Sequence, residues 1–198
     1  MKRSYYIKPI YRILLAGCSL GLLAACAGLP PPSGAPHPVY ITDTRAISLL
    51  PPSAGNQERS IHQAVEGYFG NTAVSFEGFV RMDRNEIIMI AMTPFGSGVY
   101  EIMYDGQKAT VTGGMLPAGA KPEYMVADFQ FCYFPADAVF RNVAAAGLNF
   151  RESTTASGWR RIIEDQGQVV MEVQRAGNEL SFTNHLRHYG YIIKELPE

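Results

Sequence analysis

A cysteine near the N-terminus has the sequence context of a lipid attachment site. A basic segment over residues 2–12 precedes an apolar run that ends in Leu23-Ala24-Ala25-Cys26. A secretory signal peptide combines a positive segment, an apolar stretch of about 7–15 residues and small residues before the cleavage point. When the next residue is cysteine, the pattern is that of a bacterial lipoprotein. We therefore predict that residues 1–25 are a signal peptide and that Cys26 is lipidated.

Two alternatives to this assignment remain open. Leu15-Ala16-Gly17-Cys18 is locally as suitable, but the segment between Arg12 and Cys18 is short for the apolar part of a signal peptide. An uncleaved anchor is the other alternative, although the apolar run falls short of the roughly 20 residues that span a bilayer. Residue 27 is alanine, and an aspartate there would favour retention in the inner membrane. We expect anchoring to the outer membrane, on its periplasmic face.

The other reactive side chains form no catalytic or metal-binding pattern. Gly96-Ser97-Gly98 lacks the Gly-x-Ser-x-Gly spacing of a nucleophile elbow. His185 and His188 have no carboxylate or cysteine close by in the sequence, so a solvated turn explains them better than a zinc site does. Asp83 and Glu164-Asp165 are expected at strand edges, where charges face water. We expect no enzyme activity, no catalytic residue, no metal and no cofactor.

Cys132 and the basic pair Arg160-Arg161 are the remaining candidate functional residues. Cys132 lies in an apolar stretch and is expected to be a buried small side chain. Once Cys18 is removed and Cys26 lipidated, Cys132 has no partner for an intramolecular disulfide. Arg160-Arg161 follows Trp159 and either anchors a lipid headgroup or a partner's carboxylate, or faces solvent at a strand end.

Composition limits the size and the partners of the mature protein. Removing residues 1–25 from 198 leaves 173, which is enough for one domain with a hydrophobic core. The removed segment carries four of the 17 basic residues and none of the 18 acidic ones, so 13 basic and 18 acidic residues leave a formal charge of −5. This charge makes nucleic acid an unsuitable partner. We expect a monomer.

The prolines divide the chain into a tether and a domain. Residues 29–38 are too rich in proline to form a helix or pair in a sheet. We predict a lipidated cysteine and tether over residues 26–59, with residues 39–50 as a peripheral strand, and a folded domain over residues 60–198. The domain is expected to begin with a short helix over residues 60–69.

Within the domain, alternation of apolar and polar residues predicts a mainly β fold with a helical insert, an α+β class. The helices are expected at residues 122–134 and 135–146, separated by Pro135. Turn residues separate the strands. The strands are expected at residues 74–83, 86–92, 99–104, 107–112, 148–152, 159–164, 169–174, 179–184 and 189–196. This order predicts an open or partly closed antiparallel barrel.

Two segments carry a resemblance to known families. Residues 88–102, an apolar strand, the turn Pro94-Phe95-Gly96-Ser97 and a second strand, resemble the LolA/LolB-like lipoprotein-carrier family. Residues 122–135 look like a LolB-like lipoprotein family of unknown function that is encoded beside aryl-polyene biosynthesis genes. The resemblance implies a curved, half-open antiparallel β-barrel whose concave face is covered by helices and accepts acyl chains. It also implies that Phe95, between Pro94 and Gly96, projects and helps deliver cargo into the membrane.

The residue types alone allow two interpretations of Phe95 and two of the barrel interior. Phe95 at a strand-to-strand tip either inserts into lipid or a partner, or folds back over the barrel mouth. The apolar strand residues line either a ligand cavity, helped by adaptable methionines, or an ordinary packed core. The candidate cavity residues are Phe76, Val80, Met82, Ile88, Ile90, Met92, Tyr100, Ile102, Tyr104, Val169, Met171, Val173 and Phe182.

The expected function follows from the anchor, the resemblance and the missing chemistry. We expect an outer-membrane lipoprotein that binds a lipid, an acyl chain or an aryl-polyene-like lipid and assists its transfer at the membrane, with a periplasmic carrier protein as a partner. A non-catalytic scaffold of an envelope or biosynthetic complex is the alternative. An enzyme acting on an acyl substrate is a third and weaker one.

Overall fold

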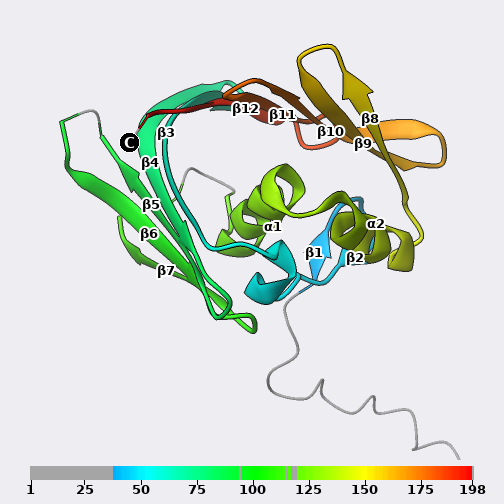
Figure 1. Cartoon of the computed structure of the whole chain (residues 1–198), viewed down its shortest axis with the longest axis horizontal. Helices are drawn as coiled ribbons and strands as arrows, with labels where there is room; N and C mark the ends of the chain where they lie inside the picture. The colour runs from blue at the N-terminus through cyan, green and yellow to red at the C-terminus, as the bar shows by residue number, and fades with distance from the viewer. Residues whose placement is uncertain (1–37, 94, 115, 117–119, 198) are drawn as a thin grey trace, which may run out of the picture. The chain divides into compact units, whose positions relative to one another are not determined.

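The computed structural model describes residues 38–93, 95–114, 116 and 120–197. Within them, α-helices lie on the concave side of a curved antiparallel sheet (Figure 1). The strands are β1 (Val39–Tyr40), β2 (Ala46–Ile47), β3 (Arg59–Phe69), β4 (Thr72–Met82), β5 (Ile87–Met92), β6 (Gly98–Tyr104), β7 (Ala109–Gly113), β8 (Asn149–Thr155), β9 (Gly158–Asp165), β10 (Gln168–Ala176), β11 (Glu179–Asn184) and β12 (Tyr189–Glu195). The helices are the 3₁₀ turn η1 (Pro52–Gly55), α1 (Pro122–Tyr133) and α2 (Ala136–Ala145).

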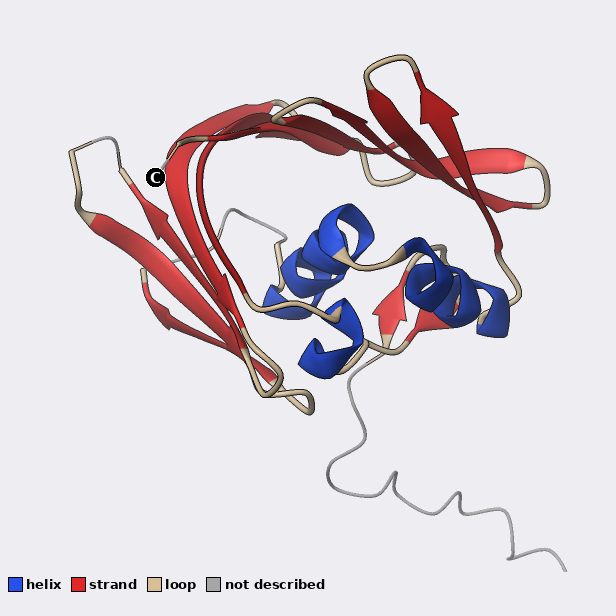
Figure 2. Cartoon of the chain, viewed as in Figure 1, coloured by secondary structure: helices blue, strands red, loops and turns tan. Residues whose placement is uncertain are grey.

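The large sheet is open. Its ten strands follow the order β7-β6-β5-β4-β3-β12-β11-β10-β9-β8, so β7 and β8 are its edges. At the centre of the sheet, β3 pairs with β12, which are its first and last strands in chain order. The chain passes from the edge β7 to the edge β8 through α1 and α2, which places both helices inside the curve (Figure 2). This confirms the predicted α+β class, the open curved sheet and the helices on its concave face.

Prolines set the limits of α1. Pro122 occupies the first turn, where its missing amide hydrogen costs nothing. Pro135 follows Phe134, which is extended with φ −78° and ψ 156°, as a residue before proline prefers. Within these limits the residues from Val126 to Tyr133 are all buried. The helix is therefore enclosed by other elements on every side in its last two turns.

The folded part begins earlier than expected. Val39, Ile47 and Leu49 are each at most 6% exposed and belong to the core. The segment is held by a mutual hydrogen-bond pair, in which the amide of Leu50 donates to Gln130 Oε1 (2.9 Å) and Gln130 Nε2 donates to the Leu50 carbonyl (2.7 Å). The peripheral strand expected in residues 39–50 is present as β1 and β2, but its side chains join the core, so the folded part begins near residue 39 and not at residue 60. Residues 26–37 lie outside the described part.

The predicted helix over residues 60–69 is also wrong, because these residues belong to β3. Apolar residues at Ile61, Val65 and Phe69 have a spacing of four that suits a helix. The segment instead pairs along its length with β4 and over most of it with β12. Pairing on both sides satisfies the backbone groups and overrides the local pattern. The other expected strands and both expected helices are present.

Residues 34–198 form one compact unit. Among the residues that the structure describes, the core is continuous and includes side chains from both halves of the large sheet and both α-helices. The tests below use this unit, which contains the whole described core.

Ile102 on β6 and Ile192 on β12 provide a matched test of which sheet face forms the core. Ile102 is fully buried and Ile192 is 49% exposed. We predict that Ile102→Ala lowers the free energy of unfolding by about 2–5 kcal/mol, because it leaves a cavity. Ile192→Ala should cost less than about 1 kcal/mol. Urea unfolding measures both values, and equal losses would contradict the assignment of the concave face as the core.

Candidate hydrophobic binding site

A small apolar cavity lies between α1 and the concave face of the sheet. Its volume is about 60 Å³, which is room for about two water molecules. Its walls come from α1 and from β3, β4, β5, β6 and β12. The lining residues are Gln63, Val65, Phe69, Phe76, Val80, Met89, Ile90, Ala91, Tyr100, Met125, Asp128, Phe129, Cys132, Tyr133, Tyr191 and Ile193.

Strand register decides which side chains face this cavity. On β4 and β5, Met82 pairs with Ile87 and Val80 pairs with Met89. Directly paired residues lie on the same face of a sheet. The concave face therefore carries even-numbered residues on β4 but odd-numbered residues on β5.

The predicted cavity residues on β5 therefore lie on the wrong face of the sheet. Ile88, Ile90 and Met92 pair with Arg81, Phe79 and Glu77 of β4, which places them on the convex face. Only Ile90 of the three borders the cavity. The prediction assumed that even-numbered residues face the cavity on both strands. The turn between β4 and β5 instead places odd-numbered residues of β5 on that face.

The remaining predicted cavity residues divide into three groups. Phe76, Val80 and Tyr100 border the cavity. A second group is buried in the core but does not border it: Met82, Ile102, Tyr104, Met171, Val173 and Phe182. Val169 is 36% exposed beside a register shift in β10. Six of the thirteen predicted residues are therefore packed core outside the cavity wall.

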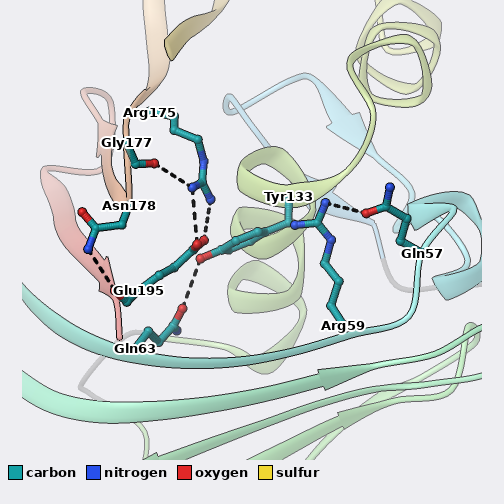
Figure 3. A network of polar contacts seen from close by, with 8 residues as sticks. All are labelled: Gln57, Arg59, Gln63, Tyr133, Arg175, Gly177, Asn178 and Glu195. Atoms are coloured by element: carbon teal, nitrogen blue, oxygen red, sulfur yellow. Dashed lines mark hydrogen bonds and ion pairs between the residues drawn. The ribbon is translucent and has the colours of Figure 1, made fainter. Parts of the chain in front are cut away.

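Polar contacts fix the C-terminal end of α1. Tyr133 donates a hydrogen bond to Gln63 Oε1 on β3 (3.2 Å), and its ring lies near the guanidinium groups of Arg59 (6.0 Å) and Arg175 (5.8 Å). Figure 3 shows Tyr133 within this network, where Arg175 is also paired with Glu195 of β12. By contrast, Tyr124 and Met125 near the N-terminal end of α1 are only partly buried. The helix is held more firmly at its C-terminal end.

A buried carboxylate lies at the middle of α1. Asp128 is 4% exposed and accepts hydrogen bonds from the hydroxyls of Tyr189 (3.0 Å) and Tyr191, both on β12. Burial raises the pKa of Asp128 to about 7, although the two tyrosine hydrogen bonds and the charge of Arg187 oppose this rise. The carboxyl group thus gains or loses a proton near neutral pH.

One residue that lines the cavity, Tyr100, has a hydroxyl without a hydrogen-bond partner among the described residues. Tyr100 is 6% exposed, and its Oη is buried without a hydrogen bond to any of the described residues. Burial raises the pKa of this phenol to about 12, so it is neutral at physiological pH. An unsatisfied buried hydroxyl costs about 1–3 kcal/mol.

The loop between β5 and β6 presents the most exposed large apolar side chain that the structure describes. Phe95 is 95% exposed, so its ring projects and does not fold back over the sheet. Gly96 beside it has φ +80°, a conformation that glycine adopts without strain. Pro94 and the predicted lipidation site Cys26 lie outside the described residues.

The other sequence candidates have structural partners. Arg161 is buried, and it donates to Glu152 (2.6 Å) and to the carbonyl of Phe131 (2.6 Å). Arg160 forms a bidentate pair with Glu172. Both guanidinium groups are thus paired with carboxylates of neighbouring strands. Cys132 is buried as predicted, and no cluster of potential metal ligands occurs among the described residues.

Sequence reasoning missed the polar residues of the site. Asp128 stands in an apolar helix, and Tyr189 and Tyr191 alternate along the last strand. An acidic residue in the middle of an apolar helix is a signal, because burial of a carboxylate requires hydrogen-bond donors. The sequence did not identify Tyr189 and Tyr191 as the donors, because they lie in a distant segment that approaches α1 only in the folded sheet.

Comparison with known families matches residues 60–197 to one family model, described as a protein of unknown function (DUF3261). No curated protein matches the chain. Among the described residues no helix is both long and apolar enough to cross a membrane.

Asp128 generates a prediction about stability and pH. Its pKa in the folded state, about 7, lies above the ordinary 3.8, so between these values the folded protein binds more protons than the unfolded chain. The stabilisation is complete below pH 4 and falls as pH rises to 7, by up to about 1.4 kcal/mol per pH unit. Asp128→Asn lacks this contribution. Urea unfolding of both proteins between pH 4 and 8 gives the free energy of unfolding of the unmodified protein minus that of Asp128→Asn. This value should fall as pH rises, and a value that stays constant with pH would contradict the assignment.

Proposed function

The chain belongs to the DUF3261 family, and we propose that it is a lipid-anchored carrier that binds a hydrophobic ligand between α1 and the concave face of its sheet. The observation that carries the proposal is the cavity itself. Its walls are mostly apolar, and they include Tyr100, whose buried hydroxyl has no partner among the described residues. An apolar pocket with few polar groups is the usual form of a small-molecule site.

Ligand binding requires α1 to move. Ligand pockets usually have volumes of about 300–1,000 Å³, whereas this cavity has about 60 Å³. The structure therefore corresponds to a closed form. Because α1 is fixed at Tyr133 and Gln130 and less buried at Tyr124 and Met125, its N-terminal half is the part that gives way. An alkyl chain then takes the place of helix side chains against the sheet.

Hydrophobic transfer supplies the affinity. Each buried methylene contributes about 0.8 kcal/mol, so a long chain binds without many specific polar contacts. The resemblance to lipoprotein carriers supports a lipid, an acyl chain or an aryl-polyene-like lipid as cargo. Delivery to the outer membrane involves the anchor at Cys26 and the projecting Phe95, and it needs no covalent chemistry.

A filled interior favours a second candidate function. The space inside the sheet is occupied mainly by α1, whose residues from Val126 to Tyr133 are buried. A non-catalytic scaffold of an envelope complex needs such a packed interior and no ligand. The two functions differ in whether the purified protein takes up an apolar probe.

The first test fills the cavity. We predict that residues 34–198 bind N-phenyl-1-naphthylamine, a neutral apolar dye, with increased fluorescence. Ala91→Leu adds three carbons to a buried cavity wall and should weaken binding at least tenfold, whereas Ala73→Leu at an exposed position of β4 should not. Circular dichroism verifies that both variants are folded. Absence of dye binding by the unmodified protein would favour the scaffold.

The second test concerns Phe95. We predict that Phe95→Glu changes the free energy of unfolding by less than about 0.5 kcal/mol, because the ring is exposed. In the lipid-anchored chain it should slow transfer of a pyrene-labelled fatty acid to phospholipid vesicles by up to about tenfold. Phe140→Glu on α2 is the matched control, since Phe140 is 51% exposed. Equal transfer rates for all three proteins would exclude a role of Phe95 in delivery.

A further inference from the structure

A second pocket adjoins the apolar cavity. It has a volume of about 370 Å³ and lies at the N-terminal end of α1. Phe69, Met125 and Asp128 border both spaces. The shared residues place the two pockets side by side, and the second is large enough for a headgroup.

Two cationic side chains line the second pocket, Lys121 before α1 and Arg187 in the turn between β11 and β12. Arg187 donates to the carbonyl of Tyr40 (2.7 Å), and its guanidinium lies 5.1 Å from the centre of the Tyr124 ring. The hydrogen bond to Tyr40, which lies outside α1, places the guanidinium at the pocket independently of that helix. Neither cation is within ion-pair distance of a carboxylate in the part of the chain that the structure describes.

Among the residues that the structure describes, Asp128 is the one carboxylate that borders this pocket. Its oxygens already accept hydrogen bonds from Tyr189 and Tyr191, and burial disfavours its charged form. With Asp128 ionised, the two cations still leave a net positive charge. The pocket therefore favours an anion over a neutral or cationic group.

The loop with Phe95 opens toward the same side of the sheet as the turn with Arg187, but it is set back from that turn. β5 ends at Met92, which pairs with Glu77 of β4, whereas β12 begins at the level of Phe69 and Thr72, five residues away along β4. The register therefore does not place Phe95 beside the second pocket, and the headgroup site depends on Lys121 and Arg187.

We propose that the ligand is an anionic amphiphile, with its alkyl chain in the cavity beneath α1 and its carboxylate or phosphate between Lys121 and Arg187. This rests on the proposed carrier function and specifies its ligand class. The shared chemistry is one anionic group on a long chain, as in a fatty acid or an acidic phospholipid.

The test is displacement of bound N-phenyl-1-naphthylamine from residues 34–198. Oleate, oleoyl lysophosphatidylglycerol and oleyl alcohol, below their aggregation concentrations, carry the same chain with a carboxylate, a phosphate and a neutral group. We expect at least one anion to compete at least tenfold better than the alcohol. Lys121→Gln and Arg187→Gln should each reduce this preference several-fold, whereas Arg187→Lys retains most of it. Lys194→Gln, at an exposed position of β12, is the charge-matched control.

The outcomes separate the two claims. Preference for oleate identifies a fatty-acid headgroup, and preference for lysophosphatidylglycerol identifies a phospholipid headgroup. Equal displacement by the alcohol and the anions overturns the anionic ligand while the carrier function stands. A preference for anions that is unchanged in both Gln variants overturns the site at Lys121 and Arg187. Failure of the protein to bind the dye at all overturns the carrier function on which the inference rests.

Discussion

The burial of α1 against the concave face of an open sheet is the constraint on which the rest of the structure depends. A sheet with two unpaired edges does not enclose its own apolar face, so another element must cover it. The chain supplies that cover by crossing from β7 to β8 through α1 and α2 (Figure 2). Because α1 is buried all around in its last two turns, each polar side chain there needs a partner.

These partners are distributed unevenly along α1. Gln130 and Tyr133 bind backbone and side-chain groups near its C-terminal end, and Asp128 binds two tyrosines of β12. The first turn is only partly buried and borders the second pocket with its two cations. A helix held in this way can yield at one end and keep the other in place. That asymmetry is the physical basis of the carrier proposal, and it explains how a small cavity serves as the start of a larger site.

The sequence predicted the architecture better than the site. Period-two patterns separated by turn residues located nearly every strand, and Pro122 and Pro135 located the helices, because these signals are local. β3 was misassigned since Ile61, Val65 and Phe69 also fit a helix, and only pairing with β4 and β12 decides between the two. The phase error on β5 has the same origin, because the pairing of Met82 with Ile87 depends on turn geometry. The partners of Asp128 come from a strand about sixty residues later, which no local pattern reveals.

The central claim is that the space beneath α1 accepts a lipid. Native mass spectrometry of residues 34–198, exported to the periplasm of the source organism and purified without detergent, tests it most directly, with organic extraction to identify what is bound. We predict one equivalent of a long-chain ligand, retained by the protein and released by solvent. A mass equal to that of the polypeptide alone, in a sample that also takes up no added fatty acid, would contradict the carrier account and support a scaffold.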